Sequence, residues 1–162
     1  MALDDLLDRI SKFPRFTAGA AASQADVAAT ATSLGLTLPD PYGSFLSRFG
    51  WAWWPGGGLY GFQTAEALST NGHDYDTTRV TTRQRDRKWP EGFKTLPKEG
   101  NVLHVDEEIV FLFSADARKR AGQVAIFNYG EQGGQEVACH KNFEKYLEKV
   151  IEYQTDEFEE VE

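Results

Sequence analysis

The segment that most constrains the fold is Ile109–Phe113, where every residue is apolar. A short run of this kind is typical of a strand that is buried on both faces. Further β-type runs lie at Val102–Val105, Val124–Phe127 and Val137–His140, and a glycine-rich turn at Gly130–Gly134 separates the last two. The sequence therefore predicts a sheet whose strands follow one another along the chain.

Apolar residues at helical spacing precede and follow these strands. The pattern predicts a helix from Leu3 that ends near Phe13, a helix over Ala25–Leu34 capped by Ser23, a helix capped by Asp40, and a C-terminal helix capped by Asn142. Strands that come in a run, without alternating helices, indicate the α+β class. We expect N-terminal helices, a central, mostly antiparallel sheet of about 4–6 strands, and a C-terminal helix packed on it.

The chain has 162 residues, a length that fits one domain. We expect this domain over residues 1–154, with residues 1–22 as an N-terminal helical extension and residues 155–162 as a frayed acidic tail. Between the helices and the sheet, Leu59–Phe62 is predicted as a short strand. The segment Asn71–Lys98 is polar and has little periodicity, so we interpret it as a long connection.

The net charge of −8 argues against nucleic acid as the main partner, because an acidic protein repels a phosphate backbone. It favours basic protein partners. The basic stretch Arg79–Lys98, which contains Trp89, leaves two alternatives open: a grip on a single nucleic-acid strand, or pairing with the acidic C-terminal helix and tail.

No apolar segment is long enough to span a membrane, and the N-terminus lacks the basic start and apolar run of a secretory signal. The single cysteine, Cys139, cannot form an internal disulfide. We therefore expect a cytoplasmic protein without a membrane partner.

A metal site is conceivable around His104 and Asp106, which would share one face of a strand. A third ligand for zinc or manganese would have to come from His73 or His140. The alternative is a strand that ends in a solvated acidic turn, and we favour it because two ligands do not complete a site.

Three other groups could suggest catalysis or phosphate binding. Cys139 and His140 are adjacent in a strand and point to opposite faces, so we interpret Cys139 as a buried structural cysteine. Asp74 and Asp76 could pair as general acid and base, but they lack apolar surroundings that would raise a carboxyl pKa. Gly56–Gly58 lacks the lysine and following helix of a phosphate loop. We predict no enzyme activity, no metal and no cofactor.

The tryptophans of the segment Trp51–Trp54 allow two interpretations. Strand-like alternation would place Trp51 and Trp53 on one face and Trp54 on the other, so that at least one is exposed. An exposed tryptophan is favoured at the centre of protein interfaces. Closure of all three over the core is the alternative, and the sequence leaves both open.

The order of several short motifs resembles the SUKH superfamily. In its N-terminal signature a helix ending in Leu-Gly leads to Leu-Pro and then to a Tyr-x-x-Phe-Leu helix closed by glycine. The matching residues are Leu34–Pro39, Tyr42, Phe45, Leu46, Gly50, Gly58–Gly61, Ile109–Phe113 and Asn142–Leu147. The resemblance extends from about Ala25 to Tyr153. The tryptophan-rich segment Trp51–Pro55 departs from it, because many members have a plainer turn there.

The resemblance implies a function in binding. Known members are mostly bacterial immunity proteins that block polymorphic toxins, together with eukaryotic cell-wall regulators that act as interaction modules, and neither group is known as enzymes. We therefore expect an immunity protein whose partner is the C-terminal domain of a cognate toxin. That domain is expected to be basic, and a nuclease or a nucleotide-directed enzyme would fit. A regulatory module with several partners is the alternative, and an uncharacterised hydrolase with a pocket around His104 is a third.

We predict a partner-binding set made of aromatic anchors and a charged surround. The anchors are Trp53 and Trp54, and the surrounding acids are Asp74, Asp76, Asp106, Glu107 and Glu108.

Overall fold

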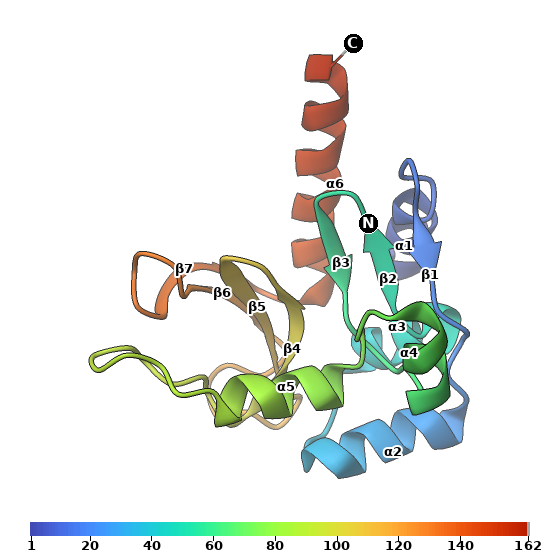
Figure 1. The fold of residues 1–162 in the computed structure, drawn as a ribbon. Coiled ribbons are helices and arrows are strands. Elements are labelled where there is room, and N and C mark those ends of the chain that lie inside the picture. Colours follow the sequence, from blue (N-terminus) through green and yellow to red (C-terminus); the bar gives the residue numbers. More distant parts are fainter. Residues whose placement is uncertain (162) are drawn as a thin grey trace.

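The computed structural model describes the backbone of residues 1–161 and the side chains of residues 1–155. Within these residues, helices lie at both ends of the chain and the strands form two antiparallel sheets (Figure 1). The helices are α1 (Leu3–Ile10), α2 (Gln24–Leu34), α3 (Asp40–Phe49), α4 (Ala65–Asn71), α5 (Thr77–Asp86) and α6 (Phe143–Val161). The strands are β1 (Thr17–Ala18), β2 (Ala52–Trp54), β3 (Gly57–Leu59), β4 (Gly100–Val105), β5 (Glu108–Phe113), β6 (Val124–Asn128) and β7 (Gln135–His140). The predicted α+β class is confirmed.

The larger sheet has the strand order β4-β5-β6-β7, each strand antiparallel to its neighbour. Alternate side chains of β5 enter different cores. Phe111 packs with Val80 of α5 on one face, whereas Leu112 packs with residues of α1, α3 and α6 on the other. Both side chains are fully buried, so the predicted strand with two buried faces is confirmed.

The smaller sheet, β1-β2-β3, adds a second layer to the single sheet that the sequence predicts. The strand expected at Leu59–Phe62 lies earlier in the chain, at Gly57–Leu59. The reason is a tight reversal at Gly56, whose positive φ of 90° lets Gly57 pair directly with Trp54. This hairpin faces α6 (Figure 1) and forms one wall of the pocket described below.

The helix ends follow the expected capping chemistry with one difference. Ser23 caps α2 in a capping box with Asp26, and Asn142 Oδ1 accepts a hydrogen bond from the Lys145 N–H at 2.9 Å. Asp40, expected as the cap of α3, is instead its first helical residue, and Pro39 holds the cap position without a side-chain hydrogen bond. An aspartate in the first turn still interacts favourably with the helix dipole.

The interpretation of Asn71–Lys98 as a connection is wrong for its first part, because α5 occupies Thr77–Asp86. This helix joins the sheet through polar contacts. The Thr77 hydroxyl donates to the Val102 carbonyl at 2.6 Å, and the Val102 N–H donates to the Thr81 hydroxyl at 2.8 Å. Buried threonines replace much of the apolar stripe, so hydrophobic periodicity could not reveal the helix.

The first 22 residues are part of the packed structure. Leu6, Leu7 and Ile10 of α1 are buried in the core that also contains Ile151 of α6 (Figure 1). Helix α6 continues to Val161, but the side chains after residue 155 lie outside the described residues. The frayed acidic tail therefore remains a prediction. None of the helices described is both long and apolar enough to cross a bilayer.

Candidate functional site

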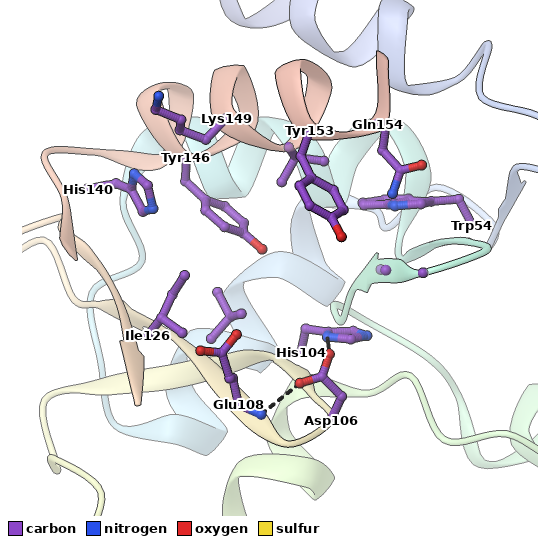
Figure 2. Close-up of a pocket in the computed structure, with 15 residues that line it drawn as sticks. Trp54, His104, Asp106, Glu108, Ile126, His140, Tyr146, Lys149, Tyr153 and Gln154 are labelled. Carbon is purple, nitrogen blue, oxygen red and sulfur yellow. Dashed lines mark hydrogen bonds and ion pairs between the residues drawn. The ribbon is translucent and has the colours of Figure 1, made fainter. Parts of the chain in front are cut away.

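A hollow of about 330 Å³ opens between α6, the β2–β3 hairpin and the turn from β4 to β5 (Figure 2). We call it the α6 pocket. Its labelled side chains in Figure 2 are Trp54, His104, Asp106, Glu108, Ile126, His140, Tyr146, Lys149, Tyr153 and Gln154. A cavity of this size that combines aromatic walls with a few polar groups is suited to binding a side chain or a small ligand.

The turn Asp106–Glu108, which we call the acidic turn, carries carboxylates on one rim of the pocket. Its backbone is held by two hydrogen bonds: the Glu108 N–H donates to Asp106 Oδ1 at 2.7 Å, and the Asp106 N–H donates to the Glu108 carbonyl at 3.0 Å. Asp106 remains largely exposed. The expectation of a strand that ends in a solvated acidic turn is therefore confirmed.

His104 lies on β4 beneath the acidic turn and is mostly buried. Its Nδ1 is 3.8 Å from Asp106 Oδ2, and its ring is 5.6 Å from that of Tyr60. Burial lowers the pKa of His104, and the nearby Asp106 only partly offsets this effect. The imidazole is therefore mainly neutral at pH 7 and leaves the charge of the carboxylates uncompensated.

Tyr146 and Tyr153 lie about two turns apart on the same face of α6, and their hydroxyls point from the helix toward the acidic turn (Figure 2). Tyr146 is 9% exposed, and its hydroxyl makes no hydrogen bond with any residue whose side chain is described. Burial raises the pKa of Tyr146, and Asp106 and Glu108 raise it further. The hydroxyl is therefore protonated and lies in the negative field of both carboxylates.

Gln154 closes the pocket beside Trp54 (Figure 2). The residue is 2% exposed, and its Oε1 is a buried acceptor without a partner among the described residues. Lys149 lines the opposite end and pairs with Glu152 at 3.2 Å. A buried acceptor that lacks a donor costs free energy, so this oxygen would gain from a ligand that brings one.

The structure separates the two tryptophans predicted as anchors. Trp53 is 36% exposed, whereas Trp54 is 2% exposed and packs edge-to-face on Phe13 with ring centroids 5.5 Å apart. Trp54 therefore serves as a pocket wall and as core together. Trp51 precedes β2 and stacks on Tyr75 at 4.2 Å, which buries it as well.

Asp74 and Asp76 are used inside the fold and do not line the α6 pocket. Asp74 pairs with Arg79 at 3.1 Å and with Arg83 at 2.6 Å. Asp76 is buried and caps α5, where it accepts hydrogen bonds from the N–H groups of Arg79 and Gln63. Of the predicted acids, Asp106 and Glu108 line the pocket, whereas Glu107 is exposed and does not line it.

The interpretation of Cys139 as a buried cysteine is wrong, because this residue is exposed. It lies on the outer face of β7, where its Sγ is 3.3 Å from Nη2 of Arg120. His140, the next residue, lines the α6 pocket on the other face, as strand alternation predicts. Among the described residues, no three His, Cys, Asp or Glu side chains group closely enough to hold a metal ion.

The basic stretch forms contacts of its own within the chain. Arg79 and Arg83 pair with Asp74, as described above. Arg85 donates to the backbone carbonyls of residues 97, 98 and 100, and Arg87 lies over the ring of Trp89 at 4.1 Å. These arginines are thus engaged in holding α5 and the segment that follows it.

Sequence reasoning missed Tyr153 and Gln154 as site residues and treated Tyr146 only as part of a helical core face. One signal was present: Tyr146 and Tyr153 are seven residues apart, which places both on one face of a helix. Whether that face borders a cavity depends on the position of the β2–β3 hairpin. The spacing of residues within a helix carries no information about that position.

Two comparisons with known proteins bear on this arrangement. The model of the SMI1 / KNR4 family (SUKH-1) matches residues 21–149. This range includes the start of α6 and every strand of both sheets except β1. A search of the curated proteins gave no significant match. The family is generally non-catalytic and supports a role in protein interaction, either in toxin immunity or of the SMI1/KNR4 type. Because the match covers most of the chain, this protein belongs to the SMI1/KNR4 (SUKH-1) family.

Proposed function

We propose that this chain is a non-enzymatic immunity protein, which acts in the cytoplasm by binding a cognate toxin domain and occluding its active or substrate-binding site. The observation that carries the proposal is the family match over residues 21–149. The acidic balance of the chain supports it, since a net charge of −8 favours a basic partner.

The contact surface we propose combines Trp53 with the acidic turn. Trp53 is a large side chain left partly exposed, and the acidic turn presents carboxylates to solvent. Toxin domains that act on nucleic acids or nucleotides need basic groups around their active sites. An acidic blocker associates with such a domain quickly and competes electrostatically with the phosphate-containing substrate.

The other predicted residues support this surface from within the fold. Trp54 holds the β2–β3 hairpin against the core, and Asp74 and Asp76 order the segment before α5. Their loss would affect binding through stability.

A regulatory interaction module with several partners is the alternative, and the same family match is compatible with it. The two functions differ in the number of partners and in the affinity for each. An immunity protein has a single tight partner, whereas a module has several weaker ones.

An immunity function predicts that a large toxin gene lies next to the gene for this chain, and the test is growth rescue in cells that express the C-terminal domain of that toxin. We expect co-expression of this chain to restore growth and the two proteins to co-purify at a 1:1 ratio in low salt. A chain with Asp106, Glu107 and Glu108 all replaced by lysine should rescue poorly. Failure of the wild-type chain to restore growth or to bind would contradict the immunity function and favour the regulatory module.

A further inference from the structure

We propose that the α6 pocket receives an arginine side chain of the partner protein, with the guanidinium between the tyrosines of α6 and the carboxylates of the acidic turn. This inference rests on the proposed function for the identity of the partner. The chemistry of the pocket supports it independently.

The first argument is a set of hydrogen-bond acceptors without donors. The Glu108 carboxylate forms no hydrogen bond or ion pair with the described side chains, and Oε1 of Gln154 is buried without a partner. Tyr146 is 9% exposed, and its hydroxyl points into the cavity (Figure 2). This hydroxyl also has no hydrogen-bond partner among the described side chains. A ligand that brings several N–H donors between α6 and the acidic turn would pair with Glu108 and the Tyr146 hydroxyl, and Gln154 Oε1 offers a separate acceptor beside Trp54.

The second argument is the charge inside the pocket. Asp106 and Glu108 lie on one rim, and both raise the pKa of Tyr146 across the cavity. His104 and His140 do not neutralise them, because burial lowers the pKa of each histidine. The pocket is therefore negative at the end where the tyrosine hydroxyls converge, which favours a cation.

The cation already present, Lys149, lies at the other end of the cavity and pairs with Glu152 at 3.2 Å. Both side chains of this pair are largely exposed. Among the described residues that line the pocket, no cationic side chain contacts the acidic turn. The space beside the acidic turn is therefore open to a cationic group of a ligand.

The third argument is aromatic. Tyr153 is 66% exposed at the mouth of the pocket, and Trp54 forms the wall near Gln154. A guanidinium is planar, so its face stacks on such rings. At the same time, its N–H groups donate hydrogen bonds, in the plane of the group, to carboxylate or amide oxygens. A lysine ammonium is a compact charge with fewer donors, so it fits this combination less well.

The pocket volume of about 330 Å³ admits one extended side chain and excludes a folded peptide. A single arginine from the toxin would thus anchor the complex beside the acidic turn. If that arginine serves the toxin in binding phosphate, its capture would also explain inhibition.

The experiment uses the full chain labelled with ¹⁵N and a small probe, N-acetyl-L-arginine methylamide, followed by NMR. We expect saturable shifts of the Gly56–Gly58 amides and of the Trp54 indole N–H, with a dissociation constant of about 1 mM. The citrulline analogue has the same shape without the charge, and we expect it to bind at least about fivefold more weakly. The lysine analogue should fall between the two.

Matched variants locate the binding. Glu108→Gln should weaken arginine binding about fivefold, and Glu91→Gln, which removes the same charge from an exposed loop outside the pocket, should not. Tyr146→Phe should also weaken binding and leave the urea midpoint unchanged or higher, since its hydroxyl is unpaired in the free protein.

Free L-arginine distinguishes a protein side chain from a metabolite. Its carboxylate would be repelled by the acidic turn, so we expect weaker binding than for the blocked probe. Equal or tighter binding of free arginine would overturn the assignment to a partner side chain. Equal binding of the citrulline or lysine analogue would overturn the guanidinium site itself.

Growth rescue separates failure of this inference from failure of the proposed function. Rescue without arginine binding would remove the pocket from the interface and leave the immunity function intact. Arginine binding without rescue would retain the guanidinium site and reject a toxin as its source.

Discussion

Asp76 and Asp106 are both aspartates next to regular elements, yet their surroundings give them different roles. Asp76 is buried, and its two carboxylate oxygens accept hydrogen bonds from the N–H groups of Gln63 and Arg79 at 2.9 and 3.1 Å. Asp106 is exposed, accepts a hydrogen bond from the Glu108 N–H of its own turn, and has Oδ2 3.8 Å from His104 Nδ1. Residue type alone does not distinguish a structural acid from one that is free to meet a partner.

We expect Asp76→Ala to lower the free energy of unfolding by about 2 kcal/mol, because it removes a helix cap and leaves the buried Gln63 N–H without an acceptor. Asp106→Asn keeps an acceptor in an exposed turn and should cost less than about 0.5 kcal/mol. Urea denaturation followed by tryptophan fluorescence measures both. Equal losses for the two variants would refute a structural role for Asp76.

Asp74 makes part of the stability depend on pH. Burial would raise the pKa of its carboxyl, but the Asp76 N–H together with Arg83 and Arg79 outweighs burial and holds this pKa below its ordinary value of 3.8. The pKa is thus lower in the folded state than in the unfolded state. Stability from Asp74 is therefore complete above the ordinary pKa and is lost as the pH falls through the folded value.

We expect Asp74→Asn to lower the free energy of unfolding by about 1 kcal/mol at pH 7. The difference from the wild type should be constant down to about pH 5 and should shrink below pH 4. Unfolding curves at pH 7, 5 and 3 give the comparison. A difference that grows on acidification would show that the ion pairs with Arg79 and Arg83 do not hold Asp74 in its charged form.

At the scale of elements, the smaller sheet depends on a close approach of two backbones. Gly50 ends α3 with a φ of +69°, and its carbonyl accepts a hydrogen bond from the Phe62 N–H at 2.9 Å. Gly61 lies against the same carbonyl, so a Cβ at this position would overlap it and would come within 2.6 Å of Leu46 Cδ2. The chain can therefore pass from β3 to α4 only with glycine here.

We expect Gly61→Ala to cost more than about 2 kcal/mol of stability, because a backbone carbonyl cannot move aside as a flexible side chain can. Gly43→Ala is the matched control. Gly43 lies inside α3, and its nearest neighbour would be Val27 Cγ1 at 3.9 Å, an ordinary contact. This control should be neutral or more stable by up to about 1 kcal/mol. A tolerated Gly61→Ala would mean that the junction can open.

At the scale of the whole molecule, charge distribution separates a binding face from a structural one. The net charge is −8, while the basic stretch is engaged with Asp74, backbone carbonyls and Trp89 around α5. The acidic turn lies on the α6 side of the larger sheet, and α5 packs on the other face. A basic partner would be drawn to the α6 side.

We expect replacement of Asp106, Glu107 and Glu108 by lysine to slow association with the toxin domain about tenfold at low salt, with a smaller change in dissociation rate. Stopped-flow measurements over a range of salt concentrations test this, and the difference should diminish as salt screens the charges.

The control variant carries Asp5→Lys, Asp86→Lys and Glu91→Lys, exposed positions with the same change in net charge. It should slow association much less. Similar slowing in both variants would mean that total charge, and not the acidic turn, steers the encounter.

Local patterns along the sequence determined much of this protein. The five apolar residues of Ile109–Phe113 predicted a strand buried on both faces, and capping residues such as Ser23 and Asn142 marked helix starts, because both signals act between near neighbours in the chain. The motif order from Leu34–Pro39 to the C-terminal helix predicted the superfamily, and the family match confirms it.

Tertiary structure alone decided which of these residues form a site. Helix α5 is held by buried hydroxyls of Thr77 and Thr81, whose partners on β4 lie more than twenty residues away. The α6 pocket likewise joins Trp54, the acidic turn and α6, three segments from distant parts of the chain. The packing of these segments determines the burial of Tyr146, and burial in turn determines its pKa and its lack of hydrogen-bond partners. Sequence patterns do not contain this information, because desolvation depends on all neighbours in space and not on neighbours in sequence.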